Sequence, residues 1–553
     1  MTVSADEHFE LDACSMLGPP TGPTLIPAEL RRRMEAGTPM ALIDVREHGE
    51  YNAAHIPGAS SVPRRLLEQT IDRLVPTRHV PVVLYDDDGR RALLAGETLS
   101  AMGYGFLDIL TGGINRWASE GYPTEWGMNV PSKDFGEMVE VRHHVPSISA
   151  TDLKEKLDRG EDLVILDTRT PEEFQRACIP GGQSVPGAEL PLRIADIVAE
   201  RPNAQVVVNC AGRTRSIIGT RTLQRMGLEH VVGLRNGTSG WSLAGLELER
   251  GAQRLNLGDP SPEGRARAEA FARRVAQEDG VRALSVDGLR DLMSRADRVM
   301  YFIDVRSQEE FETGHIPGFT WVPGGQAVQR VDDTVAIRSA HVVFSCDSVT
   351  RSFVTASWYR QMGFRRVYAV DGGTDAWAAA GHDLEGGSAE ARPFGLDEAE
   401  RMVPTIDPGS LANALASNPD LQMIFVDTSR EFSAGHIPGA RWLSRSWLEL
   451  NVVDIAEDLD APLVITDVSG RSSLLAALTL AKLGYRRVGA LAGGMKAWQA
   501  AGLAVEQGLT GIMDPPTDVV PAGTERSYAD MVQYLRWEEA LGQKYEQAVS
   551  APS

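Results

Sequence analysis

The chain has 553 residues, which is enough for three or four domains of ordinary size rather than one large core. Its 55 Lys and Arg against 76 Asp and Glu give a formal net charge of −21, which argues against binding to nucleic-acid phosphates or anionic membranes. With 42% hydrophobic and 24% charged residues, the composition is typical of packed globular domains and excludes disordered and low-complexity classes.

The N-terminal segment and the cysteines indicate the compartment. The first residues contain neither a basic start nor an apolar run, and no later segment reaches the about 20 apolar residues that span a bilayer. The four cysteines are too few and too scattered for a disulfide framework or a zinc cluster. We therefore expect a reduced, cytoplasmic protein without a metal or organic cofactor, and with no membrane or nucleic-acid partner.

One segment occurs four times along the chain. It reads LIDVREHGEYNAAHIPGA at Asp44, ILDTRTPEEFQRACIPGG at Asp167, FIDVRSQEEFETGHIPGF at Asp304 and FVDTSREFSAGHIPGA at Asp427. The four aspartates are 123, 137 and 123 residues apart, a spacing far longer than that of solenoid repeats. Each copy therefore predicts a whole domain.

A second element follows each copy: VVLYDDDGRRA, VVVNCAGRTRS, VVFSCDSVTRS and LVITDVSGRSS. Its equivalent positions are Asp86, Cys210, Cys346 and Asp467, and each lies 31 residues before a tryptophan that follows a glycine-containing pair. The repeats predict domains at 24–126, 146–250, 282–388 and 403–508. The remaining parts are an N-terminal tail (1–23), linkers (127–145, 251–281 and 389–402) and a C-terminal tail with a helix (509–553).

The fold class follows from domain 2. Leu163 to Leu166 and Val206 to Val208 are short apolar runs typical of strands buried on both faces, and a stretch with helical periodicity begins at Ser216. Strands that alternate with helices predict an α/β fold in which each domain is a doubly wound, mostly parallel sheet flanked by helices. Ligand sites in such folds lie where a strand ends and a helix begins, which is where Cys210 stands.

The residues after Cys210 favour its thiolate form. The stretch Cys210-Ala211-Gly212-Arg213-Thr214-Arg215 is expected to wrap backbone N–H groups around one point at the N-terminus of a helix. Two arginines add positive charge suited to binding an oxyanion.

The four segments together resemble the rhodanese homology domain. The resemblance rests on the D-V-R…G-H-I-P-G-A element, the loop after the second strand and the G-G…W element, in fixed order in four copies. It implies an enzyme that moves sulfane sulfur from thiosulfate or a related donor, through a persulfide on Cys210, to cyanide or a thiol. Gly212, Arg213 and Arg215 are the residues expected to bind the donor. The alternative is a persulfide relay or regulatory scaffold that delivers sulfur to a protein thiol.

Loop length separates the reaction classes of this fold. Phosphatases and arsenate reductases that resemble rhodaneses carry a seven-residue loop, whereas Cys210 to Arg215 counts six residues. A phosphatase therefore ranks below a sulfurtransferase. Domains 1 and 4 carry Asp86 and Asp467 in place of the cysteine, and a carboxylate cannot carry a persulfide, so these domains are expected to be inactive.

Domain 3 leaves activity open. Its loop runs from Cys346 to Arg351, so it keeps a catalytic candidate and a terminal arginine for the donor, but Asp347 places a negative charge beside the thiol. A neighbouring carboxylate raises the pKa of a thiol and discourages anionic donors.

Further expectations concern the other cysteines, the charged residues of the first element, the pairing of domains and the C-terminal segment. Cys178 is expected to be a packing residue rather than a resolving thiol, and Cys14 to be incidental. The aspartates that end the first strand are expected to be structural. The arginine two residues after each of the first three is expected to pair with an acidic neighbour, such as Glu50, Glu173 or Glu310. Domains 1 and 2, and domains 3 and 4, are expected to form tandem halves that each hold one cysteine and one aspartate copy.

The C-terminal tail is expected to contain a helix that packs on the body through one face. The residues on that face are Tyr528, Met531, Leu535, Leu541 and Tyr545.

Overall fold

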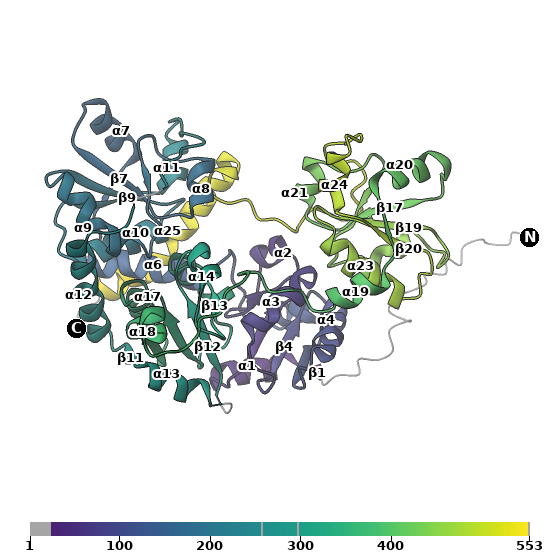
Figure 1. Cartoon of the computed structure of the whole chain (residues 1–553), viewed down its shortest axis with the longest axis horizontal. Helices are drawn as coiled ribbons and strands as arrows, with labels where there is room; N and C mark the ends of the chain where they lie inside the picture. The colour runs from purple at the N-terminus through teal and green to yellow at the C-terminus, as the bar shows by residue number, and fades with distance from the viewer. Residues whose placement is uncertain (1–23, 256–257, 296–297, 551–553) are drawn as a thin grey trace, which may run out of the picture. The chain divides into compact units, whose positions relative to one another are not determined.

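The computed structural model describes residues 24–255, 258–295 and 298–550, and these residues contain four five-stranded sheets (Figure 1). The chain divides into two compact units: unit 1 contains residues 1–128 and 391–520, and unit 2 contains residues 129–390 and 521–553. Unit 1 therefore holds domains 1 and 4, and unit 2 holds domains 2 and 3.

The elements of domain 1 in chain order are β1 (Thr24–Leu25), α1 (Pro27–Glu35), β2 (Ala41–Asp44), α2 (His48–Ala53), β3 (Ser60–Ser61), η2 (Arg64–Leu66), α3 (Leu67–Leu74), β4 (Val82–Tyr85), α4 (Arg90–Ala101), β5 (Leu107–Leu110) and α5 (Gly113–Ser119). Those of domain 4 are α19 (Leu396–Met402), β16 (Thr405–Ile406), α20 (Pro408–Ser417), β17 (Gln422–Phe425), α21 (Ser429–Ala434), β18 (Arg441–Trp442), α22 (Leu448–Asn451), η3 (Val452–Asp454), β19 (Leu463–Thr466), α23 (Arg471–Lys482), β20 (Val488–Leu491) and α24 (Gly494–Ala500).

The elements of domain 2 and the helix before it are α6 (Val130–His143), β6 (Ser147–Ile148), α7 (Ala150–Asp158), β7 (Leu163–Asp167), α8 (Pro171–Arg176), β8 (Gln183–Ser184), α9 (Leu190–Glu200), β9 (Gln205–Asn209), α10 (Thr214–Arg225), β10 (Val231–Leu234) and α11 (Gly237–Leu243). The rest of unit 2 comprises α12 (Pro262–Glu278), β11 (Arg282–Leu284), α13 (Val286–Met293), β12 (Met300–Asp304), α14 (Gln308–Thr313), β13 (Thr320–Trp321), α15 (Gly324–Gln329), α16 (Val331–Thr334), β14 (His341–Ser345), α17 (Thr350–Gln361), β15 (Val367–Val370), α18 (Gly373–Ala379), η4 (Gly523–Glu525) and α25 (Tyr528–Ser550).

All four sheets share one topology. The strand order in domain 2 is β6-β10-β9-β7-β8, and the other three sheets repeat it strand for strand. Every pairing is parallel; β7 pairs with β9 from Leu163 opposite Gln205 to Asp167 opposite Asn209. The central strand β9 is buried almost throughout because helices cover both faces of the sheet. The predicted doubly wound α/β fold is therefore confirmed.

The predicted pairing of domains along the chain is wrong. The units join domain 1 to domain 4 and domain 2 to domain 3, so the two aspartate copies share one unit and the two cysteine copies share the other. The contacts that decide this are side-chain contacts between domains, which the repeats themselves do not encode.

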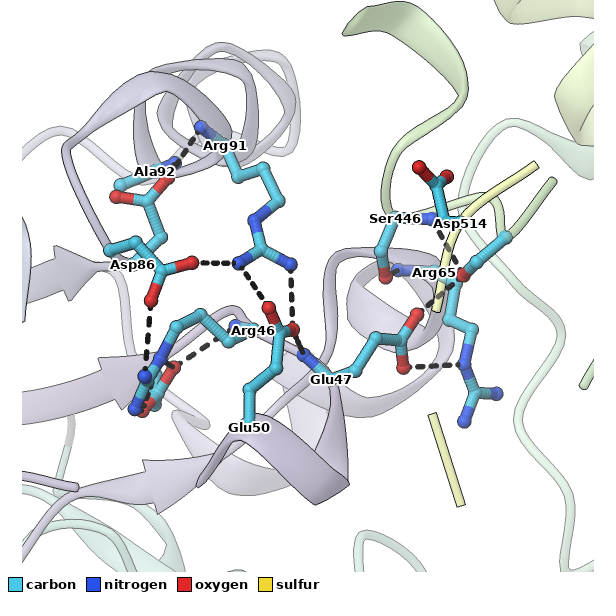
Figure 2. Close-up of polar contacts among 12 residues, drawn as sticks. Arg46, Glu47, Glu50, Arg65, Asp86, Arg91, Ala92, Ser446 and Asp514 are labelled. Carbon is cyan, nitrogen blue, oxygen red and sulfur yellow. Dashed lines mark hydrogen bonds and ion pairs between the residues drawn. The ribbon is translucent and has the colours of Figure 1, made fainter. Parts of the chain in front are cut away.

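Charged and hydroxyl side chains join domains 1 and 4 within unit 1. Buried Glu47 accepts a hydrogen bond from Arg65 (3.1 Å) and another from Ser444, while Ser446 accepts one from the backbone N–H of Arg65 at 3.2 Å (Figure 2). Arg64, also buried, donates to Glu449 of domain 4 at 2.8 Å. Because both partners of each bond are withdrawn from solvent, these bonds fix the register of the two domains.

Small residues and one linker helix join domains 2 and 3 within unit 2. A Cβ on Gly187 would stand 3.8 Å from the Cα of Gly325, so the two backbones lie in near contact. Helix α12, which lies in the predicted charged linker, packs on both α9 of domain 2 and α17 of domain 3. Domains 2 and 3 are therefore in direct contact and also share the packing of α12.

The C-terminal helix belongs to unit 2. Helix α25, yellow in Figure 1, packs along α6. Met531 and Leu535 are buried, as the predicted apolar face requires, whereas Tyr528 is exposed. The prediction of a packed terminal helix is confirmed, with Tyr528 wrongly placed on the packed face.

Candidate active site

The equivalent positions of the four repeats lie directly after the central strand of each sheet. Asp86 follows β4, Cys210 follows β9, Cys346 follows β14 and Asp467 follows β19. In each domain a helix of 12 residues begins within five residues of that position. The positive end of that helix and the unpaired N–H groups of its first turn therefore point at the loop.

In each domain a glycine lies directly against the first residue of the loop. Gly237 has a φ of +53°, and a Cβ there would overlap the carbonyl oxygen of Cys210. The next residue, Thr238, donates its backbone N–H to that same carbonyl at 2.9 Å. The bond recurs in the other domains, with Ile114 donating to Asp86, Thr374 to Cys346 and Met495 to Asp467. The glycine that precedes each of these donors therefore lets the backbone after the last strand approach the loop closely.

In domains 1 and 4 the aspartate carboxylate fills its own loop. Asp86 accepts hydrogen bonds from the backbone N–H groups of Arg91 (2.6 Å) and Ala92 (3.3 Å), and from that of Gly89. Figure 2 shows Asp86, Arg91 and Ala92 together at the end of β4. Asp467 repeats the arrangement, accepting from Gly470 at 2.6 Å and Ser472 at 2.8 Å. These N–H groups form an anion cradle, which we define as the loop amides that converge on the equivalent position.

Cys210 stands in the equivalent cradle of domain 2. It is only 2% exposed, and its thiol donates to the hydroxyl of Ser216 at 3.5 Å. Ser216 in turn donates to the carbonyl of Arg213 at 2.8 Å, which fixes the hydroxyl oxygen as an acceptor toward the sulfur. A serine holds this place in domains 2, 3 and 4, so its recurrence six residues after the loop begins was a usable sequence signal.

Arg215 forms a two-bond ion pair with Glu173, at 2.7 and 2.9 Å. Burial lowers the pKa of Arg215, but the charge of Glu173 outweighs this and raises the pKa above its usual value. Burial raises the pKa of Glu173, and Arg215 more than reverses that effect, bringing the pKa to about 2. Glu173 also accepts from the backbone N–H of Thr170 in the capping box of α8.

The arginines after the leading aspartates pair with an acidic neighbour as predicted, but not with the expected glutamates. Arg169 does not pair with Glu173 but with Asp167, two residues before it, at 2.7 Å. Arg46 and Arg306 do the same with Asp44 and Asp304. In domains 1, 2 and 3 the glutamate pairs instead with the arginine at the end of the loop. These contacts also support a structural role for the leading aspartates.

Arg213 is held by the helix before domain 2. Its guanidinium donates to Glu137 of α6 at 2.6 and 2.8 Å, and also to Glu140. Glu539 of α25 lies 3.4 Å away. Both arginines predicted to bind the donor are therefore already paired with carboxylates, although Arg215 still interacts electrostatically with Cys210.

Cys346 stands in a different electrostatic setting. It is fully buried, its sulfur lies 3.2 Å from the hydroxyl of Ser352, and burial together with Asp347 raises its pKa to about 12. Arg351 is shared among Glu310 (2.6 Å), Asp347 (2.9 Å) and Glu189 of domain 2 (2.9 Å). The thiol of Cys346 therefore stays protonated near neutral pH.

The remaining cysteines lie apart from this chemistry. Cys178 is fully buried beside Phe174 and Ala252, and burial followed by the charge of Glu249 raises its pKa to about 11. That setting favours packing. Cys14 lies outside the described residues. Within residues 24–255, 258–295 and 298–550, no cluster of histidine, cysteine and carboxylate side chains has the arrangement of a metal site. Among the same residues, no helix has the length and apolar character that a membrane crossing requires.

The four domains share a parallel five-stranded sheet and a loop after its central strand, where backbone N–H groups hold an aspartate in domains 1 and 4. These two features define one class of α/β domain. The rhodanese-like domain model matches residues 26–120, 149–244, 285–380 and 407–501, and the chain belongs to this family. A crystal structure of a thiosulfate sulfurtransferase from Pseudomonas aeruginosa is 37% identical, with a TM-score of 0.85 and coverage of 95% of this chain and 98% of that chain.

Curated relatives match parts of the chain. A putative thiosulfate sulfurtransferase of Mycobacterium tuberculosis is 28% identical over 200 residues, which are 30% of this chain and 70% of the relative. A putative sulfur carrier protein of Bacillus subtilis is 32% identical over 98 residues, which are 18% of this chain and 51% of the relative. For two of the curated relatives the chain spans only 51% and 58% of their length. These similarities support sulfur transfer as the general kind of chemistry.

Proposed function

We propose that the protein is a sulfurtransferase that carries sulfane sulfur as a persulfide on Cys210. The observation that carries this proposal is the anion cradle. In domains 1 and 4 the loop amides hold a carboxylate, and in domain 2 the equivalent position is a cysteine. A site that accommodates a carboxylate anion is suited to a thiolate and to the persulfide anion formed from it.

The reaction has two balanced steps. The Cys210 thiolate attacks the outer sulfur of thiosulfate, a sulfur–sulfur bond forms, and the bond to the sulfonate sulfur breaks so that sulfite leaves with the electron pair. A cyanide ion or thiolate then attacks the terminal sulfur of the persulfide and regenerates the Cys210 thiolate. To donate to the sulfur anion once the thiol proton is gone, the hydroxyl of Ser216 has to give up its hydrogen bond to the carbonyl of Arg213.

Cys346 has no part in this cycle. Its burial and the adjacent Asp347 keep the thiol protonated, and Arg351 has no charge to spare for a donor because it is shared among three carboxylates. Domains 1, 3 and 4 therefore serve as scaffold for domain 2. Gly212, Arg213 and Arg215 stay as predicted donor-binding residues. Arg215, whose ion pair is with Glu173, is the stronger candidate, because Arg213 is shared among three carboxylates as Arg351 is.

A relay to a protein thiol is the second candidate. It is favoured by the 2% exposure of Cys210, which suits a sulfur that is handed over in a protected setting. The similarity to a putative sulfur carrier protein points the same way. A relay differs from an enzyme with small-molecule acceptors in one observable: discharge of the persulfide would need a protein thiol and would be slow with cyanide.

Intact-mass analysis after treatment with thiosulfate tests both candidates. We expect the wild type and Cys346→Ser to gain one sulfur that cyanide removes, and Cys210→Ser to gain none. A gain that depends on Cys346 would contradict the assignment to Cys210. Persulfide that forms but resists cyanide would favour the relay. No gain in any protein with thiosulfate or an organic thiosulfonate would refute the persulfide proposal.

A further inference from the structure

The C-terminal helix covers the outer side of the Cys210 loop. A Cβ on Gly212 would stand 3.1 Å from Oε2 of Glu538 and 3.8 Å from side-chain atoms of Tyr534 and Leu535. Just before the helix, a Cβ on Gly523 would stand 3.5 Å from the methyl group of Ala211. Residues more than 300 positions away in the sequence therefore form one wall of the site.

Glu538 brings a carboxylate to that wall. Its side chain is 2% exposed, and its Oε1 accepts a hydrogen bond from the Tyr534 hydroxyl at 2.9 Å. The other oxygen, Oε2, is buried and forms no hydrogen bond with any of the described residues, and it is the oxygen nearest Gly212. A buried carboxylate oxygen without a partner is costly, so its position at the loop calls for an explanation.

The cations near Glu538 also contact other groups. Arg213 pairs with Glu137 and Glu140. The guanidinium of Arg526 stacks 3.8 Å from the Tyr534 ring centre, and the ammonium of Lys133 lies 4.8 Å from the same ring. Burial lowers the pKa of Lys133 to about 8, although Glu538 works against this shift. Lys133, Arg213 and Arg526 offset part of the charge of Glu538, but among the described residues none of them forms a hydrogen bond with Oε2, the oxygen nearest the loop.

We propose that Glu538 determines the charge selectivity of the Cys210 site. Its carboxylate disfavours the dianion thiosulfate and favours sulfane-sulfur donors of lower negative charge, such as organic thiosulfonates. This inference rests on the proposed persulfide chemistry of Cys210 and names the class of donor that the site prefers. Its physical basis is Coulomb repulsion in a site shielded from water, which is doubled for a dianion relative to a monoanion.

The selectivity should depend on pH. Burial raises the pKa of Glu538, opposed by Lys133 of α6, by Tyr534 on its own helix, by Arg213 of the loop and by Arg526. When Glu538 takes up a proton on acidification, its repulsion disappears, and thiosulfate gains more than a monoanionic donor does. The ratio of the two kcat/KM values removes effects that both donors share. Burial raises the pKa of Glu137 of α6 to about 7, and Glu137 interacts with both Arg213 and Glu538, so the comparison of wild type with Glu538→Gln is what isolates Glu538.

The experiment compares thiosulfate with benzenethiosulfonate, using cyanide as acceptor, in the full-length wild type and Glu538→Gln. We expect the ratio of kcat/KM for thiosulfate to that for benzenethiosulfonate to rise on the order of tenfold in Glu538→Gln. The matched control Glu546→Gln removes the same charge from an exposed position of α25 and should leave the ratio within twofold. Circular dichroism checks that the variants fold.

Each outcome decides a different point. An unchanged ratio in a folded Glu538→Gln protein that still turns over would overturn the role of Glu538 while leaving Cys210 in place. Should that variant unfold, the pH dependence is measured in Glu137→Gln, which removes the other titrating carboxylate at the loop. A ratio that still rises as the pH falls supports the proposal, and a flat ratio overturns it. Absence of turnover with both donors in the wild type would instead refute the proposed function.

Discussion

Arg215 and Glu173 are joined by two parallel hydrogen bonds, at 2.7 and 2.9 Å, between the end of the nucleophile loop and the first turn of α8. The same pair recurs as Arg91 with Glu50 and Arg351 with Glu310. Domain 4 has Ser472 at this position instead. This arginine–glutamate pair therefore holds the loop arginine in place in domains 2 and 3, which carry a cysteine, and in domain 1, which does not.

Replacing Glu173 by Gln should destabilise unit 2. The change leaves the Arg215 guanidinium largely buried without its counter-charge, which we expect to lower the free energy of unfolding by about 1–3 kcal/mol. Differential scanning calorimetry of wild type and variant measures the loss. Glu172→Gln changes the neighbouring glutamate, which is exposed, and should have little effect. An equal loss in both variants would contradict the role of the pair.

The stabilisation by this pair should vanish in acid. The pKa of Glu173 is lowered to about 2 in the folded protein, below the value of about 4.3 for an unfolded chain. A lowered pKa means that the folded state loses its proton more readily, so the stabilisation is fully present above about pH 4.3 and is lost as the pH falls through 2. Melting temperatures of wild type and Glu173→Gln should therefore converge between these limits, and a constant difference would contradict the assignment.

Cys346 should resist alkylation in the native protein. Its pKa of about 12 leaves almost no thiolate at pH 8, and its side chain is fully buried. In a Cys14→Ser, Cys210→Ser variant the remaining thiols are Cys178 and Cys346. We expect intact-mass analysis to find no uptake of iodoacetamide by this variant until denaturant is added. Rapid labelling of Cys346 under native conditions would show that the loop of domain 3 opens.

The sequence predicted the sheets and the position of the loops because both depend on local signals. Apolar runs end at Asp167 and Asn209, and the repeats align Asp86 with Cys210. It did not predict the ion pair between Arg215 and Glu173, because these residues are 42 positions apart. Arg169 lies much nearer to Glu173 in the sequence, which made it the expected partner. The cover of the loop by Glu538 and the pairing of domains were equally out of reach, because both depend on packing between segments far apart in the chain.

The hydrogen bonds that Asp86 accepts should stabilise the loop of domain 1, although burial raises the pKa of Asp86 to about 6 against the opposing charge of Arg91. Asp86→Asn loses half of its acceptor capacity and brings an amide donor against the backbone N–H groups of Arg91 and Ala92. We expect a loss of about 1–3 kcal/mol, the cost of buried donors left unpaired. Asp88→Asn is the control, because that side chain is largely exposed. Calorimetry of unit 1 unfolding compares the two, and a smaller loss for Asp86→Asn than for Asp88→Asn would refute the cradle.

Gly237 should be required for the geometry of the Cys210 loop. A Cβ at this position would overlap the carbonyl oxygen of Cys210, so Gly237→Ala must displace the loop as well as strain a backbone with a φ of +53°. Gly245→Ala supplies the control, because Gly245 has a φ of +74° and nothing within 4 Å of its Cβ position. Both variants bear the backbone strain of about 1 kcal/mol, and only Gly237→Ala moves the nucleophile. Since a displacement of about 1 Å costs on the order of 100-fold in rate, we expect persulfide formation to fall by that factor in Gly237→Ala and to persist in Gly245→Ala. Equal rates in the two folded variants would show that contact with Gly237 does not position Cys210.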